Sequence, residues 1–279
     1  MALPAYATTS EKISYYGLRI FVGLVLLFLI APILAIMPLS FNSETFFSYP
    51  MPGFSTKWYF GENGFFTNAR WTDALKLSVI LALATTLLAT CLGTLAALGL
   101  SRSNIPGRAA IMAVLISPMI VPVIISAIGL FFFYAFTGLN GTLIGIILAH
   151  TALATPFVVI TVTATLMSFD RTLMRAGASL GAPPHTVFFK VVMPLILPGV
   201  ISGALFAFVT SFDEVIVILF IGGPEQRTLP RQMFSGIREQ ISPTITAAAS
   251  VLIVFSTILL ITVELLRRRG ERLRGIRAS

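Results

Sequence analysis

Charged side chains are scarce in this sequence: Asp, Glu, Lys and Arg together supply 11% of its 279 residues. Soluble domains carry about 25%. Hydrophobic residues reach 56%, and a water-soluble fold of this length could not bury that much apolar surface. The shortage of charge therefore excludes a soluble fold and indicates a protein that crosses a membrane.

Residues that commonly carry chemistry are also few. Cysteine occurs once, as Cys91, so neither an internal disulfide nor a cysteine-held metal cluster can form within the chain. We expect no metal site, no catalytic residues and no enzymatic activity. Of the two histidines, His150 falls within an apolar run, where it could relay protons or bond to a neighbouring helix. We favour the bond to a helix, because no second ionisable residue lies nearby in the sequence.

Uncharged apolar runs locate the membrane crossings, because one ionised side chain at the bilayer centre costs about 2.5 to 3.5 kcal/mol. A helical crossing needs about 20 residues. Runs of this length predict six transmembrane helices, at about residues 17–39, 74–100, 109–135, 140–166, 195–221 and 244–266. The runs are too long for the strands of a membrane barrel. We therefore expect an all-α polytopic membrane protein in which residues 1–279 form a single transmembrane domain.

Basic residues are distributed unequally between the two sides that these helices define. Thirteen of the 19 Lys and Arg residues fall on the side of the two termini, many of them in the tail that begins at Arg267. Basic flanks of membrane helices stay in the cytoplasm. We therefore predict that both termini are cytoplasmic, and we interpret the net charge of +8 as a topology signal rather than a nucleic-acid-binding surface.

Prolines interrupt two of the predicted helices. Pro118 and Pro122 lie four residues apart in the third helix, and Pro156 lies in the fourth. A proline removes a helical hydrogen bond and clashes with the preceding turn. We expect a bent or broken helix in both places, which would either line a pathway or serve as a packing kink.

The segment between the fourth and fifth helices, residues 167–194, is too long for a structureless loop. Asp170 and Thr172 offer helix starts, and residues 171–180 can form about three turns. Gly181 and the prolines that follow it can end this helix, and residues 184–192 can form a second one. The pattern predicts a helix-turn-helix that lies across the cytoplasmic face of the membrane.

The same segment carries a motif. It reads Arg-Ala-Gly-Ala-Ser-Leu-Gly-Ala from Arg175 to Ala182, and Val-Val-Met-Pro up to Pro194. This resembles the EAA loop of binding-protein-dependent ABC importer permeases, which reads Glu-Ala-Ala, two residues, an apolar residue, Gly, nine residues and Ile-x-Leu-Pro. Gly181 takes the glycine position, whereas Arg175 stands where Glu is usual and Gly177 where the second Ala is usual. Residues 54–59 and 71–78 are similar to the external loop of the same superfamily.

The resemblance implies an importer made of several chains in the bacterial inner (cytoplasmic) membrane. Its implied partners are a second permease subunit, two copies of a cytoplasmic ATPase, an external or periplasmic solute-binding protein and membrane lipid. The residues that would couple this chain to the ATPase are Arg175, Ala176, Gly177, Leu180, Gly181, Ala182 and Pro194. No lysine of this chain stands in a Gly-Lys-Ser/Thr motif. We therefore expect ATP and Mg to be bound by the partner ATPase, and no cofactor by this chain.

Two adjacent carboxylates, Asp213 and Glu214, fall within the fifth predicted helix. Residues 211–217, together with 223–224, 228–230, 234–235, 237–238 and 242–243, resemble the spermidine and putrescine permeases of the superfamily. Membership of that branch implies two different permease chains. An intramembrane carboxylate supplies the counter-charge that a desolvated ammonium group requires. The resemblance therefore implies a pathway for a small cationic solute, most simply a polyamine, with Asp213 and Glu214 as pathway residues.

Other interpretations remain open at this point. Asp213 or Glu214 could instead pair with a basic residue of a partner subunit, and because helix neighbours point about 100° apart, only one of the two is expected to line the pathway. The cargo could be another small organic solute, such as an opine. A proton-coupled secondary transporter would need no ATPase at all.

Overall fold

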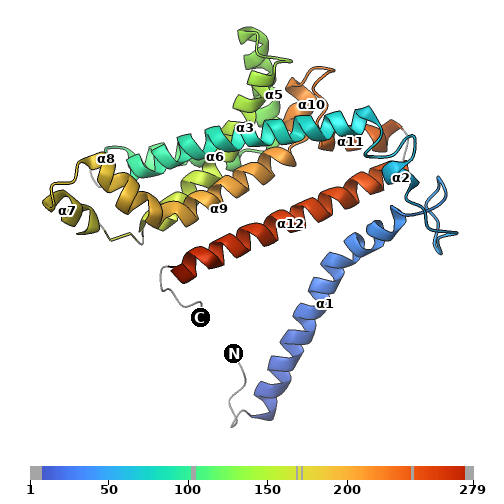
Figure 1. Cartoon of the computed structure of the whole chain (residues 1–279), viewed down its shortest axis with the longest axis horizontal. Coiled ribbons are helices and arrows are strands. Elements are labelled where there is room, and N and C mark those ends of the chain that lie inside the picture. The colour runs from blue at the N-terminus through green and yellow to red at the C-terminus, as the bar shows by residue number, and fades with distance from the viewer. Residues whose placement is uncertain (1–7, 102–104, 168, 171, 240–241, 274–279) are drawn as a thin grey trace. The chain divides into compact units, whose positions relative to one another are not determined.

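The computed structural model of the chain describes residues 8–101, 105–167, 169–170, 172–239 and 242–273. Within these ranges the chain is helical, with no strand beyond an isolated bridge between Asn42 and Phe54 (Figure 1). The helices are α1 (Thr9–Leu39), α2 (Lys57–Phe60), α3 (Ala69–Leu100), α4 (Arg108–Ile120), α5 (Val123–Thr137), α6 (Leu143–Met167), α7 (Thr172–Ser179), α8 (Pro184–Val187), the π-helical η1 (Phe188–Val192), α9 (Met193–Phe212), α10 (Ile216–Ile221), α11 (Leu229–Glu239) and α12 (Pro243–Leu273).

Membrane crossings account for most of these helices. Five spans in the described residues are long and apolar enough to cross a bilayer, and a sixth results if α4 and α5, which are bent by 102°, count as one. This confirms the all-α polytopic class. The arginine-rich tail after Leu273 lies outside the described residues.

The chain divides into two compact units, of which the first comprises the residues up to Asn68 together with Glu239–Val254. Within it, none of the residues of α1 is buried, as expected for a membrane helix covered by lipid. The loop after α1 is fixed by two hydrogen bonds: Ser40 Oγ lies 2.6 Å from the hydroxyl of Tyr59, and the indole N–H of Trp58 donates to the carbonyl of Asn42 at 2.7 Å. That residues 1–279 form one domain stays a prediction.

The second unit, Ala69–Arg238 with the chain from Phe255 onward, is built on α3, α6 and α9, which pack side by side (Figure 1). Small residues let these helices approach closely. A Cβ atom added at Gly93 of α3 would lie 2.6 Å from the Cβ of Val158 on α6. One added at Gly203 of α9 would lie 2.9 Å from the Cα of the same Val158 and 2.6 Å from Thr161 Oγ1. The three helices therefore form a tightly packed core, the three-helix core.

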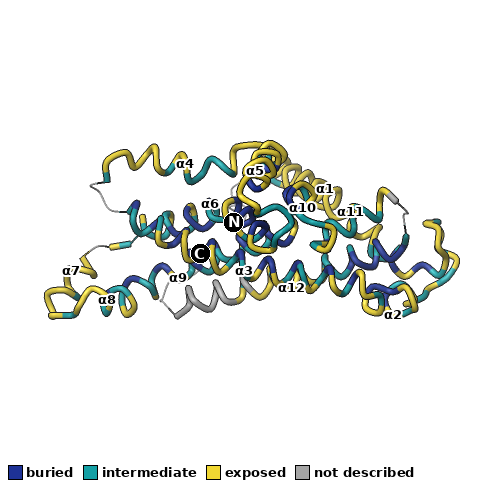
Figure 2. The backbone as a smooth tube through the Cα atoms, turned by 90° about the horizontal axis from the view of Figure 1, so that it is seen from above, coloured by how far each residue is buried: buried dark blue, intermediate teal, exposed yellow. Residues whose placement is uncertain are grey.

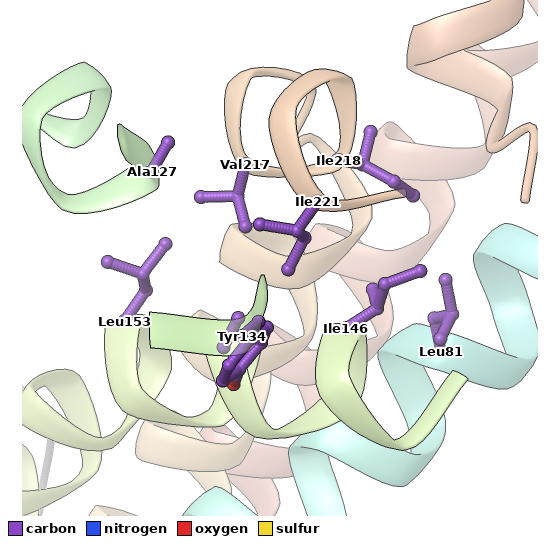
Figure 3. Packing of buried hydrophobic residues seen from close by; sticks show 9 residues of the cluster. Leu81, Ala127, Tyr134, Ile146, Leu153, Val217, Ile218 and Ile221 are labelled. Carbon is purple, nitrogen blue, oxygen red and sulfur yellow. The ribbon is translucent and has the colours of Figure 1, made fainter. Parts of the chain in front are cut away.

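A second apolar cluster surrounds the short helix α10. Val217, Ile218 and Ile221 of α10 are buried against Ile146 and Leu153 of α6 (Figure 3). Ala149 of α6, Ala127 and Tyr134 of α5, and Leu81 of α3 complete this α10 cluster. In Figure 1, α5 stands at a steep angle to α3, α6 and α9. It packs against α10, which follows the C-terminal end of α9.

Proline breaks only one of the two helices in which we expected a break. The third predicted helix ends at Ile120 and resumes at Val123, so the 102° bend falls at Pro122, while Pro118 lies inside α4. The break expected at Pro156 is absent: this proline lies buried inside α6, which continues from Leu143 to Met167 without a break.

Two further expectations for the fifth helix need correction. The helix that we predicted at 195–221 is interrupted, because α9 ends at Phe212 and α10 begins at Ile216. The second short helix that we predicted at 184–192 is not separate. It passes from α8 through the π-helical turn η1 directly into α9, so the coupling region is continuous with a membrane helix.

Candidate functional site

The interruption between α9 and α10 contains both predicted pathway residues. Residues 213–215 form this α9–α10 break, in which Asp213 is the C-terminal cap of α9 and its backbone N–H donates to the carbonyl of Val209 at 3.0 Å. A helix break within a membrane exposes backbone groups and carboxylates to a solute while the flanking helices stay packed. The sequence predicted the residues of this site and missed the break that presents them.

The two carboxylates do different things. Glu214 Oε1 accepts a hydrogen bond from the backbone N–H of Val217 at 2.9 Å. This N–H belongs to the first turn of α10, where it has no partner within the helix. Glu214 therefore caps α10, and part of its hydrogen-bonding capacity is committed to holding that helix.

Asp213 is the free member of the pair. Its side chain is exposed, and within the described part of the chain its carboxylate has neither a hydrogen bond nor an ion pair. The residue before it, Phe212, belongs to a group of three aromatic rings: its ring centroid lies 5.5 Å from that of Phe208 and 5.4 Å from that of Phe255 of α12. An unpaired carboxylate at a membrane helix break suits a cation such as an alkylammonium ion, which needs a counter-charge when it loses its hydration.

His150 is buried and contacts the helix turn that precedes Asp213. Its Nδ1 is 2.9 Å from the hydroxyl of Ser211, in the last turn of α9. This confirms the expectation that His150 bonds to a neighbouring helix. Ser211 was missed from the sequence, since a single serine in an apolar run carries no signal for its partner.

The predicted coupling loop has the expected helix-turn form. The carboxylate of Asp170 accepts hydrogen bonds from the backbone N–H of Thr172 at 2.9 Å and from its hydroxyl at 2.7 Å, which lower the pKa of this carboxyl. These bonds satisfy the first turn of α7. Arg171 lies outside the described residues.

A Schellman turn ends α7. The N–H of Gly181 donates to the carbonyl of Ala178 at 3.0 Å, and the N–H of Ala182 donates to that of Gly177 at 3.2 Å. Gly181 has φ = +76°, with nothing near a Cβ at this position. The glycine of the motif is therefore required by the left-handed backbone and not by close packing.

The surface of α7 is free, as Figure 2 shows by its colour. Arg175, Ala176 and Ala178 are exposed, and Leu180 is 87% exposed. On its other side Gly177 contacts Val187, because a Cβ at Gly177 would lie 3.1 Å from a methyl carbon of that valine. Pro194, the last predicted coupling residue, lies in the first turn of α9.

A polar junction at the far end of α10 was missed from the sequence. Gln226 donates from Nε2 to the carbonyl of Gly141 at 2.7 Å and accepts from the N–H of Gly223. Arg231 donates to the carbonyls of Gly223 at 2.7 Å and Gln226 at 3.0 Å. Burial, and next the charge of Arg227, lower the pKa of Arg231. The junction ties the loop after α10 to the turn between α5 and α6.

Nothing among the described residues forms a group of three or more His, Cys, Asp or Glu that could hold a metal ion. The site is therefore a single free carboxylate at a helix break, and the coupling loop is a short helix with an exposed face.

The chain is similar to known proteins in sequence and in fold. Residues 89–272 match the family described as "Binding-protein-dependent transport system inner membrane component". The chain is 32% identical over 251 residues to the spermidine/putrescine transport system permease protein PotC of Haemophilus influenzae, covering 90% of this chain and 96% of that protein. It is 33% identical over 233 residues to the putrescine transport system permease protein PotI of Escherichia coli K12, covering 81% and 82%.

Among solved structures, a chain of a bacterial ABC transporter involved in the import of the acidic polysaccharide alginate superposes with a TM-score of 0.73 at 16% identity, covering 95% of this chain and 99% of that one. At that identity the likeness concerns the fold alone. With its apolar spans, its helix-turn-helix loop and these matches, the chain belongs to the family of binding-protein-dependent transport system inner membrane components, and it is a permease subunit of an ABC importer.

Proposed function

We propose that this permease carries a small cationic solute, a polyamine such as spermidine or putrescine, and that Asp213 is the counter-charge that the solute meets in the pathway. The observation that carries the proposal is the exposed carboxylate of Asp213 at the α9–α10 break, which has no partner among the described residues. Two relatives, at 32% and 33% identity, are permease proteins of spermidine/putrescine and putrescine transport systems, which supports the same class of cargo.

A fixed negative charge is needed because an ammonium group loses its hydration when it enters a membrane pathway. At a separation of about 4 Å and an effective dielectric constant of about 20, a carboxylate stabilises one ammonium group by about 4 kcal/mol. Asp213 is exposed, so screening by water reduces this to about 1.4 to 2.8 kcal/mol, or about 10- to 100-fold in an equilibrium or rate. Glu214 is the weaker candidate because it already caps α10.

We infer that α7 is the coupling helix, and that its exposed face, with Arg175, Ala176 and Leu180, docks in a groove of a cytoplasmic ATPase. Movement of α7 would reach the pathway through Val187, η1 and α9, which form one continuous helical path. In this arrangement the ATPase binds ATP and Mg, and a second permease subunit and a solute-binding protein complete the importer. Both termini and α7 are cytoplasmic, and the membrane is the bacterial inner membrane.

A pair of charge-removing variants tests the proposal in vesicles that contain the assembled importer. Asp213→Asn should lower polyamine uptake about 10- to 100-fold, while assembly and the ATP hydrolysis stimulated by the binding protein stay within about twofold. Glu214→Gln is the matched control, since the amide oxygen can still accept the N–H of Val217, and its uptake should fall much less.

Each alternative gives a different result in the same assay. Loss of assembly in Asp213→Asn would mean that the carboxylate pairs with a partner subunit instead. Uptake that follows a proton gradient without ATP would indicate a secondary transporter. Normal polyamine uptake by both single variants and by the double variant would refute the electrostatic site.

A further inference from the structure

The buried pair of His150 and Ser211 has no part in the function proposed above. His150 on α6 is 1% exposed and Ser211 on α9 is 4% exposed. Their side chains are joined by a hydrogen bond of 2.9 Å between Nδ1 and Oγ. The bond connects two membrane helices at a point that is two residues before Asp213, at the last turn of α9.

This bond lies where the two apolar clusters of the second unit meet. Ile146 and Leu153, which share the His150 face of α6 because they are four and three residues away, belong to the α10 cluster. Ala207, one turn before Ser211 on α9, is packed in the three-helix core. The histidine therefore bonds to α9 where the helix leaves its tightly packed part and approaches the α9–α10 break.

The direction of Asp213 follows from the direction of Ser211. Asp213 keeps helical dihedral angles, with φ = −87° and ψ = −4°. Residues two apart in a helix point about 200° away from each other. Since Ser211 faces α6, Asp213 faces away from it, in agreement with its exposure. Side chains reach about 5 to 6 Å from the helix axis, so a rotation of about 20° would move the carboxylate by about 2 Å.

A histidine at position 150 lowers the stability of the fold. Its Nε2 is buried and has no hydrogen-bond partner among the described residues. In either neutral tautomer one ring nitrogen is therefore left unsatisfied, which costs stability. An aliphatic side chain would fill the same space without that cost, so the imidazole requires an explanation beyond packing.

We propose that His150 is a positioning residue: through its hydrogen bond to Ser211 it fixes the rotation of the last turn of α9 and so the location of the Asp213 carboxylate in the pathway. This rests on the role proposed for Asp213. At an effective dielectric constant of about 20, moving a unit charge from about 4 to about 6 Å from a cation reduces their attraction energy by about a third, which weakens cation binding about tenfold. With screening at an exposed site, loss of the bond should lower uptake about 3- to 10-fold.

Four variants separate positioning from packing. His150→Leu keeps the bulk and removes the bond, and Ser211→Ala removes it from the other side. His150→Asn should restore function, because the amide nitrogen is attached to Cγ as Nδ1 is and can reach the same hydroxyl. Thr151→Val is the matched control: it deletes a buried hydroxyl one residue away on α6 whose bond stays within the helix, to the carbonyl of Ile147 at 2.7 Å.

The readout is spermidine taken up per ATP hydrolysed by the assembled importer in vesicles, with spermidine-loaded binding protein at saturation. We expect His150→Leu and Ser211→Ala each to lower this ratio about 3- to 10-fold, with His150→Asn and Thr151→Val close to the unmodified protein. A general loss of stability would instead reduce the amount of importer and leave the ratio unchanged, and that result overturns the proposal. If His150→Leu fails to assemble, Ser211→Ala decides, since it removes only one oxygen atom.

A double-variant cycle distinguishes this inference from the proposed function. If His150 acts through Asp213, adding His150→Leu to Asp213→Asn should lower the residual uptake by less than about twofold, because there is no carboxylate left to position. An equal loss in both backgrounds overturns the positioning role and leaves Asp213 in place. Normal uptake by Asp213→Asn refutes the role proposed for Asp213, and the positioning role with it.

Discussion

The close approach of α9 to α6 at Gly203 should be sensitive to a single methyl group. A Cβ there would lie 2.6 Å from Thr161 Oγ1 and 2.9 Å from the Cα of Val158. Unbonded carbon atoms prefer about 3.5 to 4.0 Å. The threonine hydroxyl can turn away but the backbone Cα cannot, so Gly203→Ala must push the two helices apart by up to about 1 Å.

The separation should destabilise the whole three-helix core. Overpacking costs about 1 to 3 kcal/mol, and the better helix propensity of alanine returns up to about 1 kcal/mol. The net loss is about 1 to 2 kcal/mol, which for a chain of this size lowers the unfolding temperature by about 2 to 8 °C. The assay is the temperature at which half of the detergent-extracted protein no longer elutes as a single species.

Gly99→Ala is the matched control, since Gly99 also lies in a membrane helix and a Cβ there meets nothing within 4 Å. It should leave the unfolding temperature unchanged or raise it slightly. Adding Thr161→Ala to Gly203→Ala should recover part of the loss, because one of the two close contacts is removed. Equal unfolding temperatures for Gly203→Ala and Gly99→Ala would refute the reasoning.

Two further predictions concern the coupling loop and the topology. Gly181→Ala should strain the left-handed turn by about 1 to 2 kcal/mol and weaken binding of the ATPase in a pull-down from membranes. Gly181→Asn should bind the ATPase better than Gly181→Ala, because asparagine tolerates this backbone conformation. Equal binding by both variants would contradict the turn as the cause. Reporter fusions at His185 and at the C terminus should report the cytoplasm and a fusion at Asn140 the outside; the opposite pattern would reverse the orientation.

Much of the fold could be predicted from the sequence because the membrane leaves few solutions. Runs without charge are sufficient to find the long helices, since each must satisfy its own backbone. Pro122 produced a break and Pro156 did not, although both are prolines in apolar runs. Pro156 is buried in α6, which packs against α3 and α9 and continues past the proline, and a single sequence carries no information about such neighbours.

The site itself was only half predictable. Asp213 and Glu214 were identified by their charge, but their different roles depend on where α9 ends. That end could not be predicted, because no proline or glycine marks it in the sequence. The bond from His150 to Ser211 joins residues far apart in the chain. The π-helical turn η1 is likewise invisible in a run of apolar residues, because it is defined by hydrogen-bond spacing and not by composition.

The 102° bend at Pro122 bears on whether the number of membrane crossings before α7 is even or odd. At about 1.5 Å per residue, α4 and α5 are about 20 and 22 Å long, and neither can cross a hydrocarbon layer of about 30 Å alone. If together they pass through, the crossings are even in number and α7 shares a side with the N terminus. If they turned back, every later segment would be inverted, and α7 could not meet a cytoplasmic ATPase. The side on which α7 lies therefore depends on the path of the chain around Pro122, some fifty residues upstream of it.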